Sequence, residues 1–333
     1  MLKGKNVYLW RRICQLIFAI LCIMIGVQFI RFVNSVSGAD AQQITSRPAG
    51  VEAFLPISAL VALKSWIANG VFDQIHPAGL MIFLAAISLS ILWKRVFCSW
   101  ICPFGTLSEG LALLGQKVFG RNFTVPRWLD YFLRSLKYFI LAFFIFFIFV
   151  LMDGAAAYAF LQTPYNIIAD VKMLNFFKNI SGIGISVIAG LIILSILIKN
   201  FWCRYLCPYG ALLGLLSMVS PWKIRRNPDL CISCKKCSIA CPNRIEVDKS
   251  LNVSSPECSG CLNCIEQCPV RNALKFDPPR PFFFWSQRRL ALGVIIFWIA
   301  FIGAAKLSGH WENGISTEVY KKLIPFAEQF NHF

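Results

Sequence analysis

Five long apolar segments constrain the fold of this chain more than any other feature. They cover roughly residues 13–30, 78–97, 135–152, 182–200 and 289–306. About 20 helical residues cross a hydrocarbon core of about 30 Å, so each segment predicts one span. With 57% hydrophobic and only 15% charged residues, the composition also excludes an ordinary soluble domain. We therefore expect an all-α transmembrane helical bundle of about five spans.

Positive charge is distributed unevenly along the chain. Of the 33 Lys and Arg residues, 25 lie in residues 1–12, 94–137 and 199–289. Because cytoplasmic loops carry the excess of Lys and Arg, we expect a multi-pass protein of the cell inner membrane with the N-terminus and residues 199–289 in the cytoplasm. The C-terminus would then be periplasmic or external. Basic residues that flank apolar segments do not indicate a nucleic-acid-binding face.

An internal repeat occurs at an offset of 105 residues. Residues 90–105 and 195–210 both end an apolar segment with the pattern C-x3-C-P-[FY]-G. The parallel sense of the copies predicts a pseudo-twofold axis along the membrane normal. Each proline discourages a continuous helix, and the glycines Gly105 and Gly210 permit a turn.

Eight cysteines after the second copy form two runs of the type C-x2-C-x2-C-x3-C-P. In the bacterial ferredoxin pattern, three thiolates of a run bind one [4Fe–4S] cluster and the fourth reaches the other cluster. The expected ligands are Cys231, Cys234, Cys237 and Cys268 for cluster 1, and Cys258, Cys261, Cys264 and Cys241 for cluster 2. A pair of zinc sites is the alternative, but zinc explains neither the third and fourth cysteines nor the prolines.

The C-x3-C-P motifs supply a further candidate site. If the two copies converge, they bring together four thiols, those of Cys98, Cys102, Cys203 and Cys207. These could hold a shared metal or a further Fe–S centre, since thiolates select soft metals, and the nearby Arg95 and Arg204 favour thiolate. Reduced structural thiols, or a redox-active dithiol without metal, are the alternatives.

Two other side chains are weaker candidates. His76, expected where the second span leaves the outer surface, could accept a proton from a quinol, although a cap or loop residue is the plainer interpretation. Glu109 could be a cytoplasmic proton group, against a solvated interfacial carboxylate. A short apolar piece at 54–63, broken by Pro56, is expected to be interfacial or re-entrant.

The chain therefore divides into four expected parts. They are an N-terminal anchor helix (1–30), a membrane repeat domain (31–220, with copies at about 50–115 and 155–220), a small α+β cytoplasmic 2[4Fe–4S] ferredoxin-like module (221–280), and a C-terminal transmembrane helix with an external tail (281–333). The first segment is read as a retained anchor because it lacks a small-residue cleavage site before Arg31.

The two C-x3-C-P motifs and the doubled ferredoxin run resemble the membrane polyferredoxins of the NapH/NosR family over residues 50 to 275. The resemblance implies quinol oxidation and the passage of electrons across the membrane to respiratory reductases. It carries over the twelve motif cysteines and no other residue. The NosR-like branch adds a flavin-binding domain, for which the loop at 31–77 is too short, so covalent FMN is not expected.

The expected function is that of an iron–sulfur electron-transfer subunit between the quinone pool or a cytoplasmic donor and a partner respiratory oxidoreductase. As an enzyme it would be a component of a quinol dehydrogenase or other oxidoreductase, and the sequence identifies no catalytic residue. The alternative is a cupric reductase or copper-binding assembly protein, because the related copper branch has the same cysteine pattern. Expected partners are the lipid bilayer, a quinone or quinol and a redox protein, with no nucleic acid.

Overall fold

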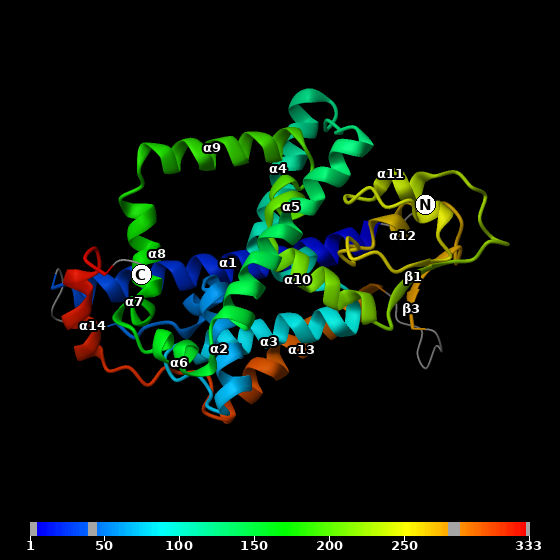
Figure 1. Cartoon of the computed structure of the whole chain (residues 1–333). Helices are drawn as coiled ribbons and strands as arrows, with labels where there is room; N and C mark the ends of the chain where they lie inside the picture. The colour runs from blue at the N-terminus through cyan, green and yellow to red at the C-terminus, as the bar shows by residue number, and fades with distance from the viewer. Residues whose placement is uncertain (1–4, 39–44, 279–286, 331–333) are drawn as a thin grey trace. The chain divides into compact units, whose positions relative to one another are not determined.

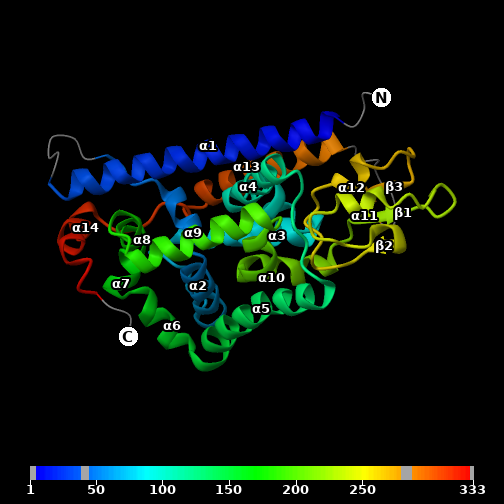
Figure 2. The same cartoon turned by 90° about the horizontal axis from the view of Figure 1, so that it is seen from above.

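The structure is a computed structural model that describes residues 5–38, 45–278 and 287–330 (Figures 1 and 2). It contains two compact units. The first comprises Met1–Ile20, Ala86–Leu141 and Ile188–Phe297, and the second comprises Leu21–Ala85, Ala142–Val187 and Trp298–Phe333. The expected boundary at 280/281 lies outside the described residues.

Apart from one small sheet, the described residues form helices and connections. The helices are α1 (Lys5–Val36), α2 (Pro56–Asn69), α3 (Pro77–Trp93), α4 (Pro103–Phe119), α5 (Arg127–Ile145), α6 (Gly154–Leu161), α7 (Pro164–Ile167), α8 (Ala169–Lys178), α9 (Gly182–Leu197), α10 (Pro208–Leu216), α11 (Lys236–Ala240), α12 (Asn263–Glu266), α13 (Gln287–Leu307) and α14 (Thr317–Leu323). Short 3-10 turns are η1 (Ala49–Phe54), η5 (Ser217–Val219), η6 (Val247–Lys249) and η7 (Ile324–Phe326), and π-helical turns are η2 (Phe97–Ile101), η3 (Phe146–Leu151) and η4 (Trp202–Leu206). The strands are β1 (Lys223–Arg226), β2 (Asn252–Val253) and β3 (Leu274–Asp277).

Fewer helices than expected have the length and composition of a span. Among the described residues three qualify, Leu9–Val36, Arg127–Leu151 and Arg288–Leu307. A fourth results if α8 and α9, bent by 87° at their junction, count as one broken span. The five expected spans therefore remain a prediction, with three or four helices that meet the criterion.

The second and fourth expected spans are shorter than the apolar sequence indicated. α3 ends at Trp93 because Lys94 adopts a left-handed conformation (φ 64°), and α9 ends at Leu197, ahead of the left-handed Asn200 (φ 57°). A left-handed residue interrupts the helical hydrogen-bond ladder, so neither helix reaches the C-x3-C-P motif that follows it. Pro56 begins α2 instead of breaking a segment, since proline is tolerated at the first helical position.

The expected α+β module is present in the first unit. Its sheet has the order β2-β1-β3 with antiparallel pairing, and Ile224 of β1 lies opposite both Val253 and Phe276. All three side chains are buried, which gives the sheet an apolar face. The helices α11 and α12, which carry cysteines, lie close to this sheet (Figure 2).

An apolar core holds the second unit together. It consists of Phe29, Phe32, Val33, Val36, Val51, Ile168, Val171, Tyr320, Ile324 and Ala327. In both views α14 lies near α7 and α8 (Figures 1 and 2). Segments from 21–85, 142–187 and 298–333 therefore share one buried core.

Beside this core lies a buried group of polar side chains, here called the Arg47 cluster: Arg47, Glu52, His76, Asn166 and Asp170. The Arg47 guanidinium is 2.7 Å from both the Glu52 and the Asp170 carboxylates, whose side chains are 0% exposed. Glu52 also accepts a hydrogen bond from the backbone N–H of Gly79 (2.9 Å). Arg47 thus compensates two buried anions, one in the turn η1 and the other in the first turn of α8.

His76 belongs to this cluster, so the candidate proton acceptor is 1% exposed. Its Nε2 donates to the carbonyl of Asn166 (2.7 Å), and its Nδ1 lies 3.5 Å from Glu52. Burial opposes protonation, but the hydrogen bond and the charge of Glu52 outweigh it and raise the pKa of His76.

The substitution Arg47→Met is expected to lower the free energy of unfolding by about 3–5 kcal/mol, because it leaves Glu52 and Asp170 buried without their cation. Denaturation in detergent measures the change. Lys178→Met, at an exposed lysine of α8, serves as the control. Equal stability of the two variants would contradict this role for Arg47.

A second prediction concerns pH. Protonated His76 stabilises the fold below its unfolded pKa of about 6.5, and this contribution is lost as the pH rises through the higher folded pKa. The charged groups that interact with it are Glu52, Asp73, Asp170 and Arg47. The stability difference between the wild type and His76→Gln should therefore shrink as the pH rises above about 6.5. A difference that does not change with pH would exclude a protonated His76.

Candidate functional site

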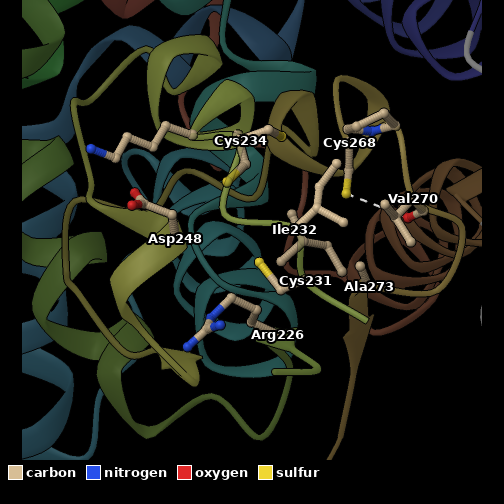
Figure 3. Close-up of a pocket in the computed structure, with 12 residues that line it drawn as sticks. Arg226, Cys231, Ile232, Cys234, Asp248, Cys268, Val270 and Ala273 are labelled. Carbon is tan, nitrogen blue, oxygen red and sulfur yellow. Dashed lines mark hydrogen bonds between the residues drawn. The ribbon is translucent and has the colours of Figure 1, made fainter. Parts of the chain in front are cut away.

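The cysteines expected for cluster 1 line one cavity of the ferredoxin-like module. Cys231, Cys234, Cys237 and Cys268 surround it together with Arg226 and apolar side chains. The labelled sulfur atoms of Cys231, Cys234 and Cys268 lie around the same space (Figure 3). The backbone N–H of Ser233 and the Arg226 side chain lower the pKa of Cys231, so this edge of the cavity favours thiolate.

The cysteines expected for cluster 2 line a second cavity. Cys241, Cys258, Cys261 and Cys264 surround it, with Ile224 and Val253 of the sheet in the wall. The backbone N–H of Ile245 points at the Cys241 sulfur (3.4 Å). Each cavity offers four sulfur ligands inside a mainly apolar wall, the donor set that a [4Fe–4S] cluster requires.

Left-handed residues shape both cysteine loops in the same way. Ser233 and Lys235 have φ values of 53° and 58°, and Gly260 and Leu262, at the matching positions of the second run, have 62°. Lys235 and Leu262 are the N-caps of α11 and α12, so Cys237 and Cys264 fall in their first turns. The local chain geometry thus follows the duplicated cysteine spacing.

The C-x3-C-P motifs also share one local structure. Cys98 and Cys203 lie in the π-helical turns η2 and η4, and Cys102 and Cys207 are the N-caps of α4 and α10. A proline occupies the first turn of each following helix. The Gly210 N–H donates to the Cys207 sulfur (3.3 Å), and a backbone hydrogen bond from Gly105 acts on Cys102 in the same way.

The structure brings these four thiols together, since Cys203 interacts electrostatically with each of the other three. Burial raises the pKa of Cys98 to about 11 and that of Cys102 to about 12, and it raises the pKa values of Cys203 and Cys207 as well. Arg95 lowers the pKa of Cys98, as expected for a nearby cation, but the effect of burial is larger and the pKa rises. Within the described residues, no three His, Cys, Asp or Glu side chains lie close enough to hold a single metal ion.

Gly105 lies inside α4, where the sequence had indicated a turn. A β-carbon at this position would lie 2.0 Å from the carbonyl oxygen of Cys98. Only glycine permits the backbone of α4 to approach η2 this closely, and this approach lets the two cysteines of the motif share one site. Gly210 likewise lies within α10, one turn after Cys207.

The first C-x3-C-P motif makes direct contact with the loop that carries Cys258. Ser99 Oγ donates to the Ser259 carbonyl (2.6 Å), and Trp100 Nε1 donates to the Gly260 carbonyl (3.2 Å). A β-carbon on Gly260 would lie 2.8 Å from Val96 Cγ1. The cluster 2 loop is therefore packed tightly against the thiol-bearing segment of the helical part.

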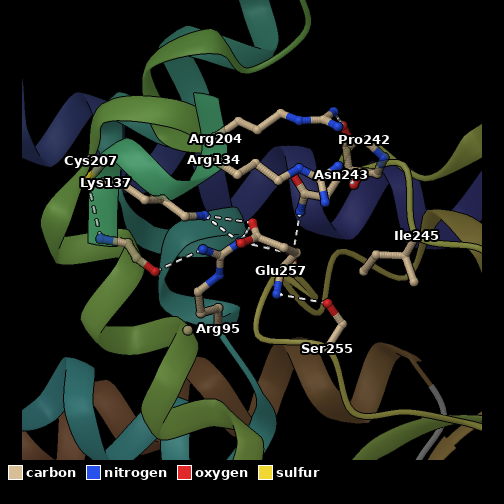
Figure 4. Close-up of polar contacts among 12 residues, drawn as sticks. Arg95, Arg134, Lys137, Arg204, Cys207, Pro242, Asn243, Ile245, Ser255 and Glu257 are labelled. Atoms are coloured by element: carbon tan, nitrogen blue, oxygen red, sulfur yellow. Dashed lines mark hydrogen bonds and ion pairs between the residues drawn. The ribbon is translucent and has the colours of Figure 1, made fainter. Parts of the chain in front are cut away.

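Arg95 connects both motifs to this loop. Its guanidinium donates to the carbonyls of Gly210 (2.8 Å) and Glu257 (2.9 Å), and it lies 3.9 Å from the Glu257 carboxylate (Figure 4). Gly210 belongs to the second motif, and Glu257 directly precedes Cys258. Arg95, which lies just before the first motif, thus contacts both the second motif and the cluster 2 loop.

The Glu257 carboxylate is the anion of this network. Lys137 Nζ lies 2.7 Å from both of its oxygens, and Tyr138 donates to it (2.9 Å). Burial opposes ionisation, but Arg95 and Lys137 outweigh it and lower the pKa of Glu257. Lys137 and Glu257 were not predicted from the sequence, although a lysine inside an apolar segment is a usable signal of a buried partner.

The second motif has its own contacts with the module. Arg204 pairs with Asp130 (2.7 Å) and donates to the Pro242 carbonyl (3.2 Å), and Arg134 donates to the Asn243 carbonyl (2.9 Å; Figure 4). Pro242 directly follows Cys241, the fourth expected ligand of cluster 2. Both chain segments that line the cluster 2 cavity are therefore held against the C-x3-C-P region.

Glu109 does not behave as the solvated carboxylate considered above. It pairs with Arg11 (2.7 Å) and Arg12 (3.4 Å) and accepts a hydrogen bond from Gln15 (3.0 Å). These contacts join α1 to α4. Glu109 is thus engaged in an ion-pair network within the first unit.

Gly105→Ala is expected to disrupt the first motif, because its methyl group would collide with the Cys98 carbonyl. Iron content and visible absorbance of the purified protein should both fall. Gly110→Ala in the same helix has nothing within 4 Å of the new methyl group and provides the matched control. Normal iron content in both variants would show that the close approach is not needed.

Two family models match the chain. One, described as a 4Fe-4S binding domain, matches residues 75–122 and again residues 180–227, and so covers both C-x3-C-P motifs. The other, described as a 4Fe-4S dicluster domain, matches residues 223–269 and covers all eight cysteines of the ferredoxin runs. No solved structure matches the chain.

Similar proteins from several bacteria support the same assignment to iron–sulfur proteins. The chain is 41% identical over 336 residues to the putative electron transport protein YccM of Escherichia coli, covering 98% of the chain and 93% of YccM. It is 23% identical to the ferredoxin-type protein NapH of E. coli, over 63% of the chain and 70% of NapH. It is 29% identical to NirI of Paracoccus denitrificans, over 65% of the chain and 31% of NirI.

These matches confirm the resemblance drawn from the cysteine motifs, and they agree with the apolar helices and the paired cysteine cavities. The chain belongs to the NapH/NosR-type family of ferredoxin-type membrane proteins, in which its iron–sulfur centres serve electron transfer.

Proposed function

We propose that this protein conducts electrons between a redox partner at its ferredoxin-like module and the quinone pool of the cell inner membrane, as part of a respiratory oxidoreductase system. Three iron–sulfur centres in series would form the path. The observation that carries the proposal is the contact between the cluster 2 loop and the C-x3-C-P region, made by Arg95, Ser99 and Trp100.

The cysteine cavities support the assignment of the first two centres. Cluster 1 would be held by Cys231, Cys234, Cys237 and Cys268, and cluster 2 by Cys258, Cys261, Cys264 and Cys241. Clusters of this type supply reversible one-electron chemistry. The surrounding residues hold the loops, direct N–H groups at sulfur atoms and keep water away, which sets the potential of each site.

A third centre at Cys98, Cys102, Cys203 and Cys207 is supported by three observations. The four thiols interact with one another, backbone N–H groups point at Cys102 and Cys207, and the 4Fe-4S binding model matches both segments. Because burial keeps these thiols protonated, loading the site with iron would release protons. Arg95 then offers positive charge close to the developing thiolates.

The contacts of the cluster 2 loops and the positions of the motifs in the sequence support an order of the three centres along the electron path. The module carries clusters 1 and 2, and the loops of cluster 2 contact the C-x3-C-P region. That region directly follows the apolar helices α3 and α9. Electrons at the third centre would therefore be nearest to the apolar phase, where quinones dissolve, and the module would face the cytoplasm as the distribution of positive charge predicts.

Iron counting tests the third centre. Anaerobically purified wild-type protein should contain about 12 irons, and the Cys98→Ser/Cys203→Ser variant should contain about four fewer and lose one EPR signal. Cys22→Ser, outside the motifs, is the control. Equal iron in all three proteins would refute a cluster at the C-x3-C-P site, and copper bound there instead would favour a metal-handling role.

Quinol oxidation tests the membrane side of the proposal. Cluster-replete protein mixed with a reduced quinone analogue should show bleaching of its visible absorbance, since each centre takes up one electron. The Cys98→Ser/Cys203→Ser variant should lose this reaction while dithionite still reduces its remaining clusters. A wild-type protein that neither oxidises a quinol nor reduces a quinone would exclude the quinone pool as its partner.

A further inference from the structure

The two halves of the ferredoxin-like module differ in exposure. Around cluster 2, Cys258 and Cys264 are 8% and 7% exposed, and the C-x3-C-P region contacts their surroundings. Around cluster 1, Cys237 is buried, Cys231 and Cys268 are half-buried like Cys241 and Cys261 of cluster 2, and Cys234 is the one exposed member of the eight. A soluble protein can therefore approach the cluster 1 cavity much more closely than the cluster 2 cavity.

The surface around Cys234, here called the port, has a distinct composition. It consists of Leu230, Ile232, Ser233, Cys234, Lys235, Lys236 and Ile239, all exposed. Ile232 and Ile239 are 66% and 82% exposed, and with Leu230 at 42% they are the large apolar side chains of this surface. The port thus combines exposed isoleucines with two adjacent lysines.

Charge around the port is positive on balance. Arg226 adds to Lys235 and Lys236, whereas the acidic residues nearby are Asp229 and Asp248, and Lys249 is already paired with Glu246 (3.2 Å). The Asp248 carboxylate is already engaged by the Ser238 hydroxyl. Together with a net charge of +17 for the whole chain, this disfavours a second copy of the same protein and favours an acidic partner.

We propose that the port binds a small soluble electron carrier, an iron–sulfur or flavin protein with an acidic face around its own redox centre. This inference rests on the proposed function. In each encounter the reduced carrier loses one electron and this protein gains one, and no bond is made or broken. Lysines steer the approach, and Ile232 and Ile239 form a small apolar contact that releases the carrier quickly.

The test uses full-length, cluster-replete protein and a reduced acidic [2Fe–2S] ferredoxin as the probe. Stopped-flow measurement at low salt gives the second-order rate of electron transfer. We expect Lys235→Glu/Lys236→Glu to slow it at least about tenfold and added salt to slow the wild type, because steering depends on charge. The control Lys117→Glu/Arg121→Glu reverses as much charge at exposed positions outside the port and should stay within about twofold of the wild type.

Lys235 has a positive φ and lies next to Cys234, so Lys236→Glu alone is the second variant, with Lys117→Glu as its control. Iron content and the extent of dithionite reduction are measured for every protein. A wild type without reducible iron contradicts the proposed function itself. If the clusters are intact and the port variants react as fast as the wild type, or no more slowly than their controls, the port is not the docking site. Loss of binding to anionic vesicles with an unchanged rate would assign these lysines to lipid and also overturn the inference.

Discussion

The first unit depends most on the hydrogen bonds that the buried guanidinium of Arg95 makes. This guanidinium joins the Gly210 carbonyl to the Glu257 carbonyl, and the Glu257 carboxylate in turn holds Lys137 and Tyr138. An isolated buried guanidinium would be costly, but here Arg95 donates to two carbonyls and the Glu257 carboxylate pairs with Lys137. The result is a fixed junction between two motifs that are 105 residues apart and a cysteine loop that comes later in the chain.

Burial has opposite consequences at the thiols and at the carboxylates of this region. The four C-x3-C-P thiols have no neighbouring cation strong enough to offset desolvation, so their pKa values rise. Glu257 has two such cations, and its pKa falls. The apolar surroundings that raise the pKa values of the unliganded thiols would also shield a bound cluster from water. Without a bound metal, the thiols of this site are therefore held in the neutral form.

The sequence was enough to propose the cysteine groups, because ligand spacing is a local property. Each quartet of the ferredoxin runs lines a single cavity, and the four C-x3-C-P thiols converge. Contacts between distant residues were not predictable in this way, since no local pattern links Lys137 to Glu257 or Arg47 to Asp170. The helix ends were likewise not predictable, because hydropathy reports apolar length but not the left-handed residue at which a helix such as α3 ends.

Gly260 and Ser233 occupy matching positions of a duplicated motif, yet only Gly260 faces a neighbour that leaves no room for a side chain. A module with two equivalent halves could dock on its membrane partner in either of two orientations. Because Gly260 has no β-carbon, the half of the module that carries it fits against the segment around Val96. A serine at this position would collide with Val96. The two halves of the duplicated module are therefore not equivalent. The half with Gly260 packs against the C-x3-C-P region, and the half with Cys234 is exposed.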